Sequence, residues 1–340
     1  MKIQGDWRFR KSLAQLNCKG VILMYHRVAK LQYDPWSLSV SPGHFEEHVQ
    51  VLKKYGRPVK MQEMGRNLKH FSFGPKEMVV TFDDGYADNF YNARPILEKY
   101  GIAATFFITT GATDTREEFW WDEIGRLTIA AKSLPEVFNV KIGGTEYRWR
   151  INLQHDEKIT EAQALAGGIP PNDTVLSKAR LHYVIWQILS YLSVEEKKVV
   201  LQEIAKWAGQ SVDSRPEYFA MTAEELKSLA ISKLFEIGAH TVHHPMLSRL
   251  SSEKQREEIV ESKNALEEML GREITSFAYP HGDYSEETLN ILKQNKFKNA
   301  CTVVSQRVAR NSDPFFLPRF GVLDWSGDEF KRNLDHWLKD

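Results

Sequence analysis

Two short polar motifs, far apart in the chain, contain the residue types of a mononuclear metal hydrolase. Asp83 and Asp84 follow an apolar run and precede Gly85, and His240 and His244 stand in a later His-Thr-Val-His-His motif. One carboxylate and two neutral imidazoles form a three-ligand set that leaves a metal position open for water. Each motif also has an ordinary explanation, a turn for the first and surface histidines for the second. The metal-site hypothesis therefore rests on finding both in one chain.

The composition is that of a globular protein without a polyanionic partner. Of 340 residues, 42% are hydrophobic and 26% charged, and 45 basic residues balance 45 acidic ones. A net charge of zero gives no support for nucleic-acid binding. Cys18 and Cys301 are too few for a disulfide framework, which favours a reducing compartment.

The first residues carry charge but no apolar stretch of the kind found in signal peptides, and no run is long enough to span a membrane. We therefore expect a cytoplasmic protein. A basic group near the start offers peripheral contact with an anionic membrane, although a solvated leader is the simpler interpretation; its members are Lys2, Arg8, Arg10, Lys11 and Lys19.

Apolar runs alternate with amphipathic stretches along most of the chain. The pattern predicts strands at 21–26, 77–82, 103–108, 234–239, 274–279 and 298–304, and helices at 41–55, 86–100, 252–270, 286–295 and 328–338. Such alternation is typical of parallel strands with crossover helices, in an open sheet or a barrel. Both polar motifs then follow strands, at the carboxyl ends where functional loops converge.

The alternation breaks between residues 113 and 215. A hairpin around Gly143 and Gly144 and two helices at 182–192 and 193–208 are expected there, the second with Ser193 and Glu196 as a capping box. We expect a discontinuous main domain, 1–112 and 216–340, with 113–215 as an insertion. The insertion either forms a cap or substrate-binding subdomain, or only packs on the main domain or makes a dimer contact.

The segment Thr81–Gly85, combined with His240 and His244, resembles the polysaccharide deacetylases of carbohydrate esterase family four, the nodulation-deacetylase homology domain. The resemblance implies a distorted (β/α) barrel and metal-dependent removal of an acyl group from a sugar. Asp84, His240 and His244 would hold the metal, and Asp83 would be the general base. Zinc is the expected metal, with cobalt or nickel as alternatives, because such a ligand set suits several borderline cations.

The third motif of this family departs from its usual form. An arginine normally steadies the base, and here Ala278 stands in its place. Arg319 is the candidate replacement, since a bidentate guanidinium would keep Asp83 ionised and oriented. Alternatively, Arg319 forms only a salt bridge on the surface. The backbone N–H of His281 corresponds to the family's oxyanion donor.

The first apolar run, ending in Tyr25-His26, resembles the permuted branch that includes the poly-N-acetylglucosamine deacetylases. In that branch the histidine acid lies near the N-terminus, which makes His26 the expected general acid. A histidine at a strand end is otherwise a common structural residue.

Aromatic side chains pack against the apolar faces of sugars, and Tyr86 and Tyr284 are the candidates nearest the motifs. Trp120, Trp121 and Trp325 are further candidates by position, and residues of this kind more often belong to a core than to a sugar-binding surface.

The sequence therefore indicates a metal-dependent N-deacetylase of an amino sugar, acting on an N-acylated sugar or oligosaccharide. A cytoplasmic enzyme would act on a precursor, such as a lipid-linked or nucleotide-linked sugar. Two alternatives stay open: a deformylase of a lipid-linked amino sugar, and an inactive carbohydrate-binding homologue. The sequence gives no indication of the oligomeric state.

Overall fold

The computed structural model describes residues 19–70, 77–154, 167–211 and 213–339, so Lys2, Arg8, Arg10, Lys11 and Cys18 lie outside the described residues. The chain divides into two compact units. The first contains the residues up to Lys30, Leu38–Asp114 and the residues from Met221 onward; the second contains Leu31–Ser37 and Thr115–Ala220. The second unit thus includes a short early segment that the sequence did not associate with the insertion.

The first unit is built on a mostly parallel sheet. Its main strands are β1 (Lys19–Tyr25), β5 (Glu77–Phe82), β6 (Ala104–Ile108), β10 (Phe235–Ala239), β11 (Ser276–Ala278) and β12 (Asn299–Cys301). Their order is β12-β11-β10-β6-β5-β1, and all neighbours in this series are parallel. Every residue of β5 and β6 is buried, as expected for strands covered on both faces.

Short segments extend the sheet and curl it toward closure. Strand β4 (Arg57–Val59) pairs with β5, and β13 (Val308–Ala309) pairs antiparallel with β1. Strand β14 (Phe320–Gly321) pairs with β1, while just before it Leu317 N–H donates to Ala300 O at 3.0 Å. This one segment therefore joins both edges of the main series, which gives the distorted barrel.

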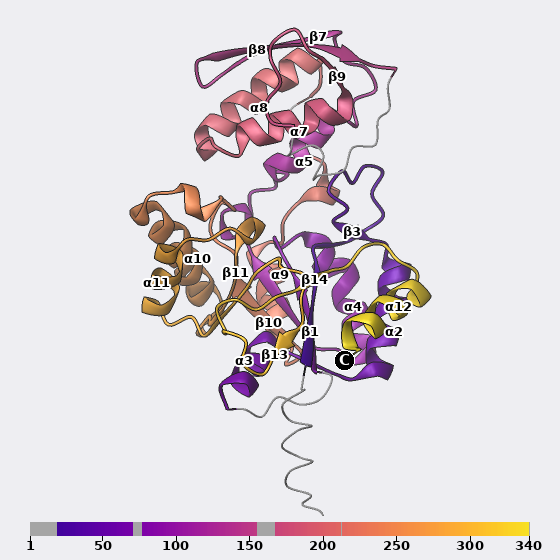
Figure 1. The fold of residues 1–340 in the computed structure, drawn as a ribbon, viewed down its shortest axis with the longest axis vertical. Helices are drawn as coiled ribbons and strands as arrows, with labels where there is room; N and C mark the ends of the chain where they lie inside the picture. The colour runs from indigo at the N-terminus through magenta and orange to yellow at the C-terminus, as the bar shows by residue number, and fades with distance from the viewer. Residues whose placement is uncertain (1–18, 71–76, 155–166, 212, 340) are drawn as a thin grey trace, which may run out of the picture. The chain divides into compact units, whose positions relative to one another are not determined.

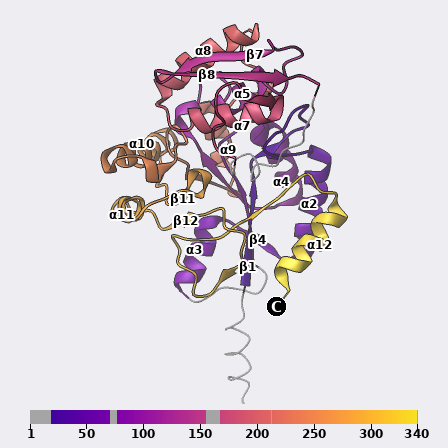
Figure 2. The ribbon, with the colours of Figure 1, turned by 45° about the horizontal axis from the view of Figure 1, so that its top comes forward.

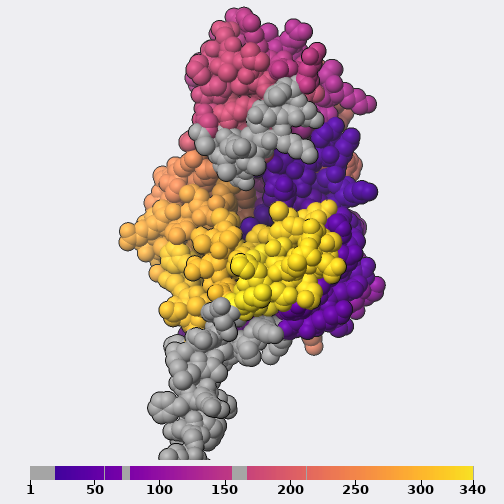
Figure 3. All heavy atoms as spheres, turned by 45° about the vertical axis from the view of Figure 1, so that its right-hand side comes forward, coloured from indigo at the N-terminus to yellow at the C-terminus, as the bar shows by residue number. Residues whose placement is uncertain are grey.

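Helices flank the sheet on two sides (Figures 1 and 2). Helices α2 (Pro42–Tyr55), α4 (Arg94–Tyr100) and α12 (Gly327–Leu338) lie on one side, and α10 (Ser252–Leu270) and α11 (Glu286–Gln294) on the other. In Figure 3 the yellow C-terminal helix α12 lies on the surface beside the indigo N-terminal segments. There the buried His48 ring stacks on Phe330 with a centroid distance of 4.3 Å.

The helix expected at 86–100 is present from residue 87, but a π-helical turn interrupts its α-helical hydrogen bonding. Asn89–Ala93 form a π-helical turn, η1, in which Arg94 N–H donates to Asn89 O, five residues back. Pro95 has no N–H, and its ring crowds the carbonyl four residues before it, which disfavours regular α-helix at this point. Regular α-helix resumes at Arg94 as α4.

The second unit contains the expected hairpin and helices. Strands β7 (Val137–Ile142) and β8 (Thr145–Asn152) are joined through Gly143 and Gly144, both at positive φ, and β9 (Val175–Ser177) adds in parallel to β8. The described residues of this unit include the helices α5 (Trp120–Leu127), α7 (Lys178–Leu189) and α8 (Val194–Ala208). The Ser193–Glu196 capping box is confirmed. Among the described residues of the whole chain, no helix combines the length and apolarity needed to cross a membrane.

Gly238 of β10 provides a test of barrel packing. An added Cβ would lie 2.6 Å from the Phe107 ring and 2.9 Å from Ser276 O, so Gly238→Ala is expected to destabilise the protein by about 1–3 kcal/mol. Gly43→Ala in α2 is the matched control, because nothing lies within 4 Å of its added Cβ. Urea unfolding measures both, and equal midpoints for the two variants would contradict the packing argument.

Candidate metal centre

Asp83 and His240 each continue the hydrogen-bonding of their strands into the rim of the barrel. Asp83 N–H donates to Tyr25 O at 3.0 Å, and His240 N–H donates to Ile108 O at 3.0 Å. The main chain at both positions is thus fixed by a neighbouring strand. The two polar motifs meet at the carboxyl ends of β5 and β10.

Asp84, His240 and His244 form a compact group. Asp84 Oδ1 lies 3.5 Å from His240 Nε2 and 3.4 Å from His244 Nε2. One potential ligand atom from each residue lies within 4.8 Å of the others, and all three residues are buried. No other group of this kind is found among the described residues.

The hydrogen bonds of this group suit a metal ion. His240 Nδ1 lies 2.8 Å from Ala278 O, and because a carbonyl only accepts, this nitrogen carries the proton. The lone pair of Nε2 therefore faces Asp84, which is the usual arrangement of a metal-binding histidine. Asp84 Oδ1 is buried and accepts no hydrogen bond from any described residue. A buried carboxylate oxygen in that state is costly unless a cation binds it.

The rim backbone is held in an unusual conformation at these residues. Asp84, Thr241, His244 and His281 all have positive φ, between 57° and 71°. This region is sparsely populated by non-glycine residues and costs on the order of 1–3 kcal/mol for each. Thr241 Oγ1 accepts the His244 N–H at 3.0 Å, which helps to hold the histidine loop. Strain concentrated at four neighbouring positions is typical of a functional site.

Arg319 reaches Asp83 through a buried bidentate ion pair. Arg319 Nη1 and Nη2 donate to the two Asp83 carboxylate oxygens, each at 2.7 Å. Arg319 Nε donates to Thr302 O at 2.9 Å and Nη1 to Thr81 Oγ1 at 3.1 Å, so its position is fixed. Burial by itself would raise the pKa of Asp83, but the charge of Arg319 outweighs it and the pKa falls to about 2. Asp83 is therefore a carboxylate at neutral pH.

His26 lies beside Asp83 by strand register. Tyr25 pairs with Phe82, so the next residues, His26 and Asp83, leave neighbouring strands at the same level. His240 and His26 also lie close enough for their charged forms to lower the pKa of the Asp83 carboxyl, with His240 the larger of the two contributions.

His281 packs against one of the proposed ligands, His244. Its ring lies 4.5 Å from the His244 ring, centroid to centroid, in an edge-to-face arrangement. His281 belongs to the short helical turn η5 (Pro280–Gly282) that follows β11. His243, which stands between the ligands in sequence, points outward, is 44% exposed and pairs with Glu258.

The aromatic candidates differ in accessibility. Tyr86 is 0% exposed and its ring lies under the Arg27 guanidinium at 4.3 Å, so it presents no face to a sugar. Tyr284 is 37% exposed and packs on Tyr279. Trp325 packs against the core of the first unit, and Trp120 and Trp121 belong to the second unit.

Sequence reasoning missed the groups that orient the site residues. These are the Ala278 carbonyl on His240, and Thr81 and the Thr302 carbonyl on Arg319. Thr81 belongs to the Thr81–Gly85 segment, but residue types alone do not indicate that its hydroxyl meets a distant arginine. Contacts made by backbone carbonyls leave no trace in residue types at all.

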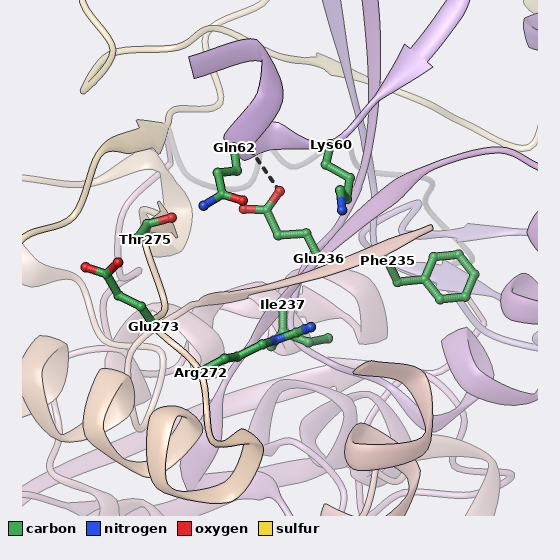
Figure 4. Close-up of a pocket in the computed structure, with 8 residues that line it drawn as sticks. All are labelled: Lys60, Gln62, Phe235, Glu236, Ile237, Arg272, Glu273 and Thr275. Atoms are coloured by element: carbon green, nitrogen blue, oxygen red, sulfur yellow. Dashed lines mark hydrogen bonds between the residues drawn. The ribbon is translucent and has the colours of Figure 1, made fainter. Parts of the chain in front are cut away.

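A polar pocket at the start of β10 serves structure instead (Figure 4). Glu236 accepts the Gln62 N–H at 2.9 Å, which stabilises the N-terminus of α3 (Met61–Lys69). Lys60 and Arg272 of this pocket donate to backbone carbonyls, those of Lys233 and Ala230. Glu236, Lys60 and Arg272 are thus engaged, at the amino end of the strand whose carboxyl end carries His240.

Removal of one ligand is expected to abolish tight metal binding. Asp84→Asn removes a ligand and should weaken Zn²⁺ affinity strongly. Loss of a residue that only hydrogen-bonds to a ligand already costs roughly 10–100-fold, and the loss here should be larger. His243→Ala is the matched control, since its side chain is exposed and points away from the group. Isothermal titration calorimetry with Zn²⁺, Co²⁺ and Ni²⁺ measures both; equal affinities would contradict the assigned ligand set.

Loss of one partner of the buried ion pair is expected to lower the free energy of unfolding strongly. Arg319→Met leaves the Asp83 carboxylate buried without its partner, which should cost about 3–5 kcal/mol. Adding Asp83→Asn should recover part of that loss, because the neutral amide carries no charge to bury. A double-mutant cycle in urea measures the coupling, and additive effects would show that the pair is not coupled.

The comparisons with known proteins identify the family of this chain. The polysaccharide deacetylase family model matches residues 72–130 and 174–300. YxkH of Bacillus subtilis (strain 168), whose name assigns it to the polysaccharide deacetylases, is 22% identical over 303 residues, covering 88% of this chain and 70% of YxkH. The poly-beta-1,6-N-acetyl-D-glucosamine N-deacetylase of Staphylococcus aureus is 31% identical over 114 residues, 30% of this chain and 39% of that protein.

A solved structure shares the fold. The Streptococcus pyogenes deacetylase PplD, in complex with acetate, superimposes with a TM-score of 0.58 at 20% identity, covering 95% of this chain and 99% of that one. The distorted α/β barrel expected from the sequence is thereby confirmed. Since the family model covers more than half of the chain, the chain belongs to the polysaccharide deacetylase family.

Proposed function

We propose that this protein is a metal-dependent N-deacetylase that hydrolyses the acetamido group of an amino sugar. The observation that carries the proposal is the compact group of Asp84, His240 and His244 beside an ionised, arginine-held Asp83. An inactive binding homologue has no need of a strained rim with an unsatisfied buried carboxylate oxygen. Membership of a deacetylase family supports the same conclusion.

Asp84, His240 and His244 would hold the ion, with zinc as the expected metal. A divalent cation in such a site polarises the acyl carbonyl and makes water a better nucleophile at neutral pH. Asp83 would take the proton of the attacking water. Arg319 fixes both oxygens of Asp83, so the carboxylate needs no reorientation when it receives that proton.

His26 would complete the reaction as the general acid. As the C–N bond breaks, the departing nitrogen takes a proton from the imidazole and leaves as a neutral amine. The backbone N–H of His281, in the turn next to His244, is the proposed donor to the oxygen that becomes negative. Tyr284 is the proposed packing surface for the sugar ring, because part of its side chain is exposed.

The proposed substrate is an N-acetylated glucosamine oligomer or a sugar linked to a lipid or nucleotide carrier. The named activity of the Staphylococcus aureus relative supports a β-1,6-linked N-acetylglucosamine oligomer as the first compound to test. The second unit, which interrupts the barrel, is the proposed contributor to substrate selectivity.

Asp83→Asn is expected to reduce kcat by about 10²–10⁴-fold, the usual contribution of a general base, without weakening metal binding. The measurement is release of acetate and formate from Zn²⁺-loaded protein. The panel contains β-1,6-linked N-acetylglucosamine oligomers, nucleotide-linked N-acetyl sugars and lipid-linked N-acyl sugars. His243→Ala again serves as control and should retain full turnover.

Formate in place of acetate would change the acyl group but keep the site. Metal-loaded protein that released neither acid from any substrate would overturn the proposal in favour of a binding role.

A further inference from the structure

The π-helical turn η1 contacts the chain segment that carries His26. Asp88, just before the turn, accepts Val28 N–H through Oδ1 at 2.9 Å and Arg27 Nε through Oδ2 at 2.9 Å. Asn92, within the turn, donates through Nδ2 to Val28 O at 2.7 Å. This turn therefore holds the main chain that follows β1, although its residues lie far away in sequence.

Asn89 makes the contact to His26 itself. Its side chain is 0% exposed, and Nδ2 donates to His26 O at 2.9 Å and to Asp88 Oδ1 at 3.0 Å. On the other side of His26, Tyr25 O accepts the Asp83 N–H at 3.0 Å. The peptide groups before and after His26 are thus both tied, one to the proposed base and one to Asn89. Together they fix the direction in which the His26 side chain leaves the backbone.

The amide of Asn89 is used only as a donor. Its Oδ1 is buried and accepts no hydrogen bond from any described residue. Leaving a buried carbonyl oxygen unsatisfied costs about 1–3 kcal/mol, so an apolar residue of similar shape would suit a purely structural position at least as well. The donor to His26 O is the feature that offsets this cost.

We propose that Asn89 is a positioning residue for the general acid: it holds the His26 main chain so that the imidazole reaches the departing nitrogen. The proposal rests on the function proposed above, in which His26 supplies that proton. A positioning residue of this kind affects the reaction only when the leaving group needs a proton. An acetamido sugar does, because an amide anion is a very poor leaving group, whereas nitrophenolate departs from 4-nitrophenyl acetate as an anion.

Asn89→Ala is therefore expected to lower kcat on an N-acetyl sugar by about 10–100-fold, the effect of a small misplacement of a reacting group. Hydrolysis of 4-nitrophenyl acetate should change by less than about twofold. His26→Ala should give the same selectivity with a larger loss, and adding Asn89→Ala to it should cost nothing further, since residues that act as a unit are not additive.

Asn295→Ala is the matched control. Asn295 Nδ2 donates to a backbone carbonyl, Ile291 O, at 2.8 Å, at the end of α11 and away from the rim. Thermal unfolding checks that both variants remain folded, and only Asn89→Ala should lose turnover on the N-acetyl sugar.

Equal losses of Asn89→Ala on amide and ester, or a further loss in the His26→Ala background, would make Asn89 merely structural and overturn the inference. If His26→Ala itself showed no selectivity, the acid assignment in the proposed function would fail instead.

A measurement without substrate keeps the inference testable in either case. The ring ¹H signal of His26, assigned by its disappearance in His26→Ala, should shift or broaden in Asn89→Ala and stay unchanged in Asn295→Ala. A His26 signal that is the same in Asn89→Ala, in Asn295→Ala and in the unmodified protein would also overturn the inference.

Discussion

The buried ion pair between Asp83 and Arg319 couples the chemistry of the site to the closure of the barrel. Removing two charges from water costs several kcal/mol for each ion, which is offset here by two short parallel hydrogen bonds and by the Thr81 and Thr302 oxygens on the guanidinium. Arg319 lies in the segment that joins β12 to β1. Separation of this segment from β12 and β1 would therefore break the ion pair. The folded barrel is thus what keeps the carboxylate charged and oriented.

Adjacent carboxylates take different roles because their surroundings differ. Asp83 meets a fixed guanidinium, which lowers its pKa to about 2, whereas Asp84 turns away through a positive φ and faces two histidines. One acid is thus neutralised by the protein and the other is left for a cation. Pairs of titratable groups in contrasting environments are a common basis of acid–base chemistry. The left-handed backbone at Asp84 is what sends the two side chains to different partners.

The sequence predicted the strands well and the rim contacts poorly. Continuous apolar runs marked β1, β5, β6 and β10, and their carboxyl ends put both motifs on one rim. The π turn at Asn89–Ala93 was missed because a helical pattern of apolar residues does not register the effect of Pro95 on the preceding carbonyls. Tyr86 was considered as a sugar platform from its place after the acids, yet its ring is covered by Arg27. Such outcomes depend on register and on main-chain contacts, which residue types alone do not specify.

The arginine that supports the base comes from a different segment of the chain than the family's third motif, and reaches Asp83 because the fold brings that segment beside it. Position 278 carries alanine, whose carbonyl orients His240, while the guanidinium comes from the segment next to β14. The insertion after β6 follows the same logic. Ala223 N–H donates to Asp114 at 3.0 Å and Met221 N–H donates to Gly85 O at 2.8 Å, so the chain leaves and re-enters the barrel at one place on the rim. The ends of the insertion lie together, so the strands that carry the site keep their register. The entropy cost of closing a loop grows only with the logarithm of its length, so a long insertion at this place adds little to that cost.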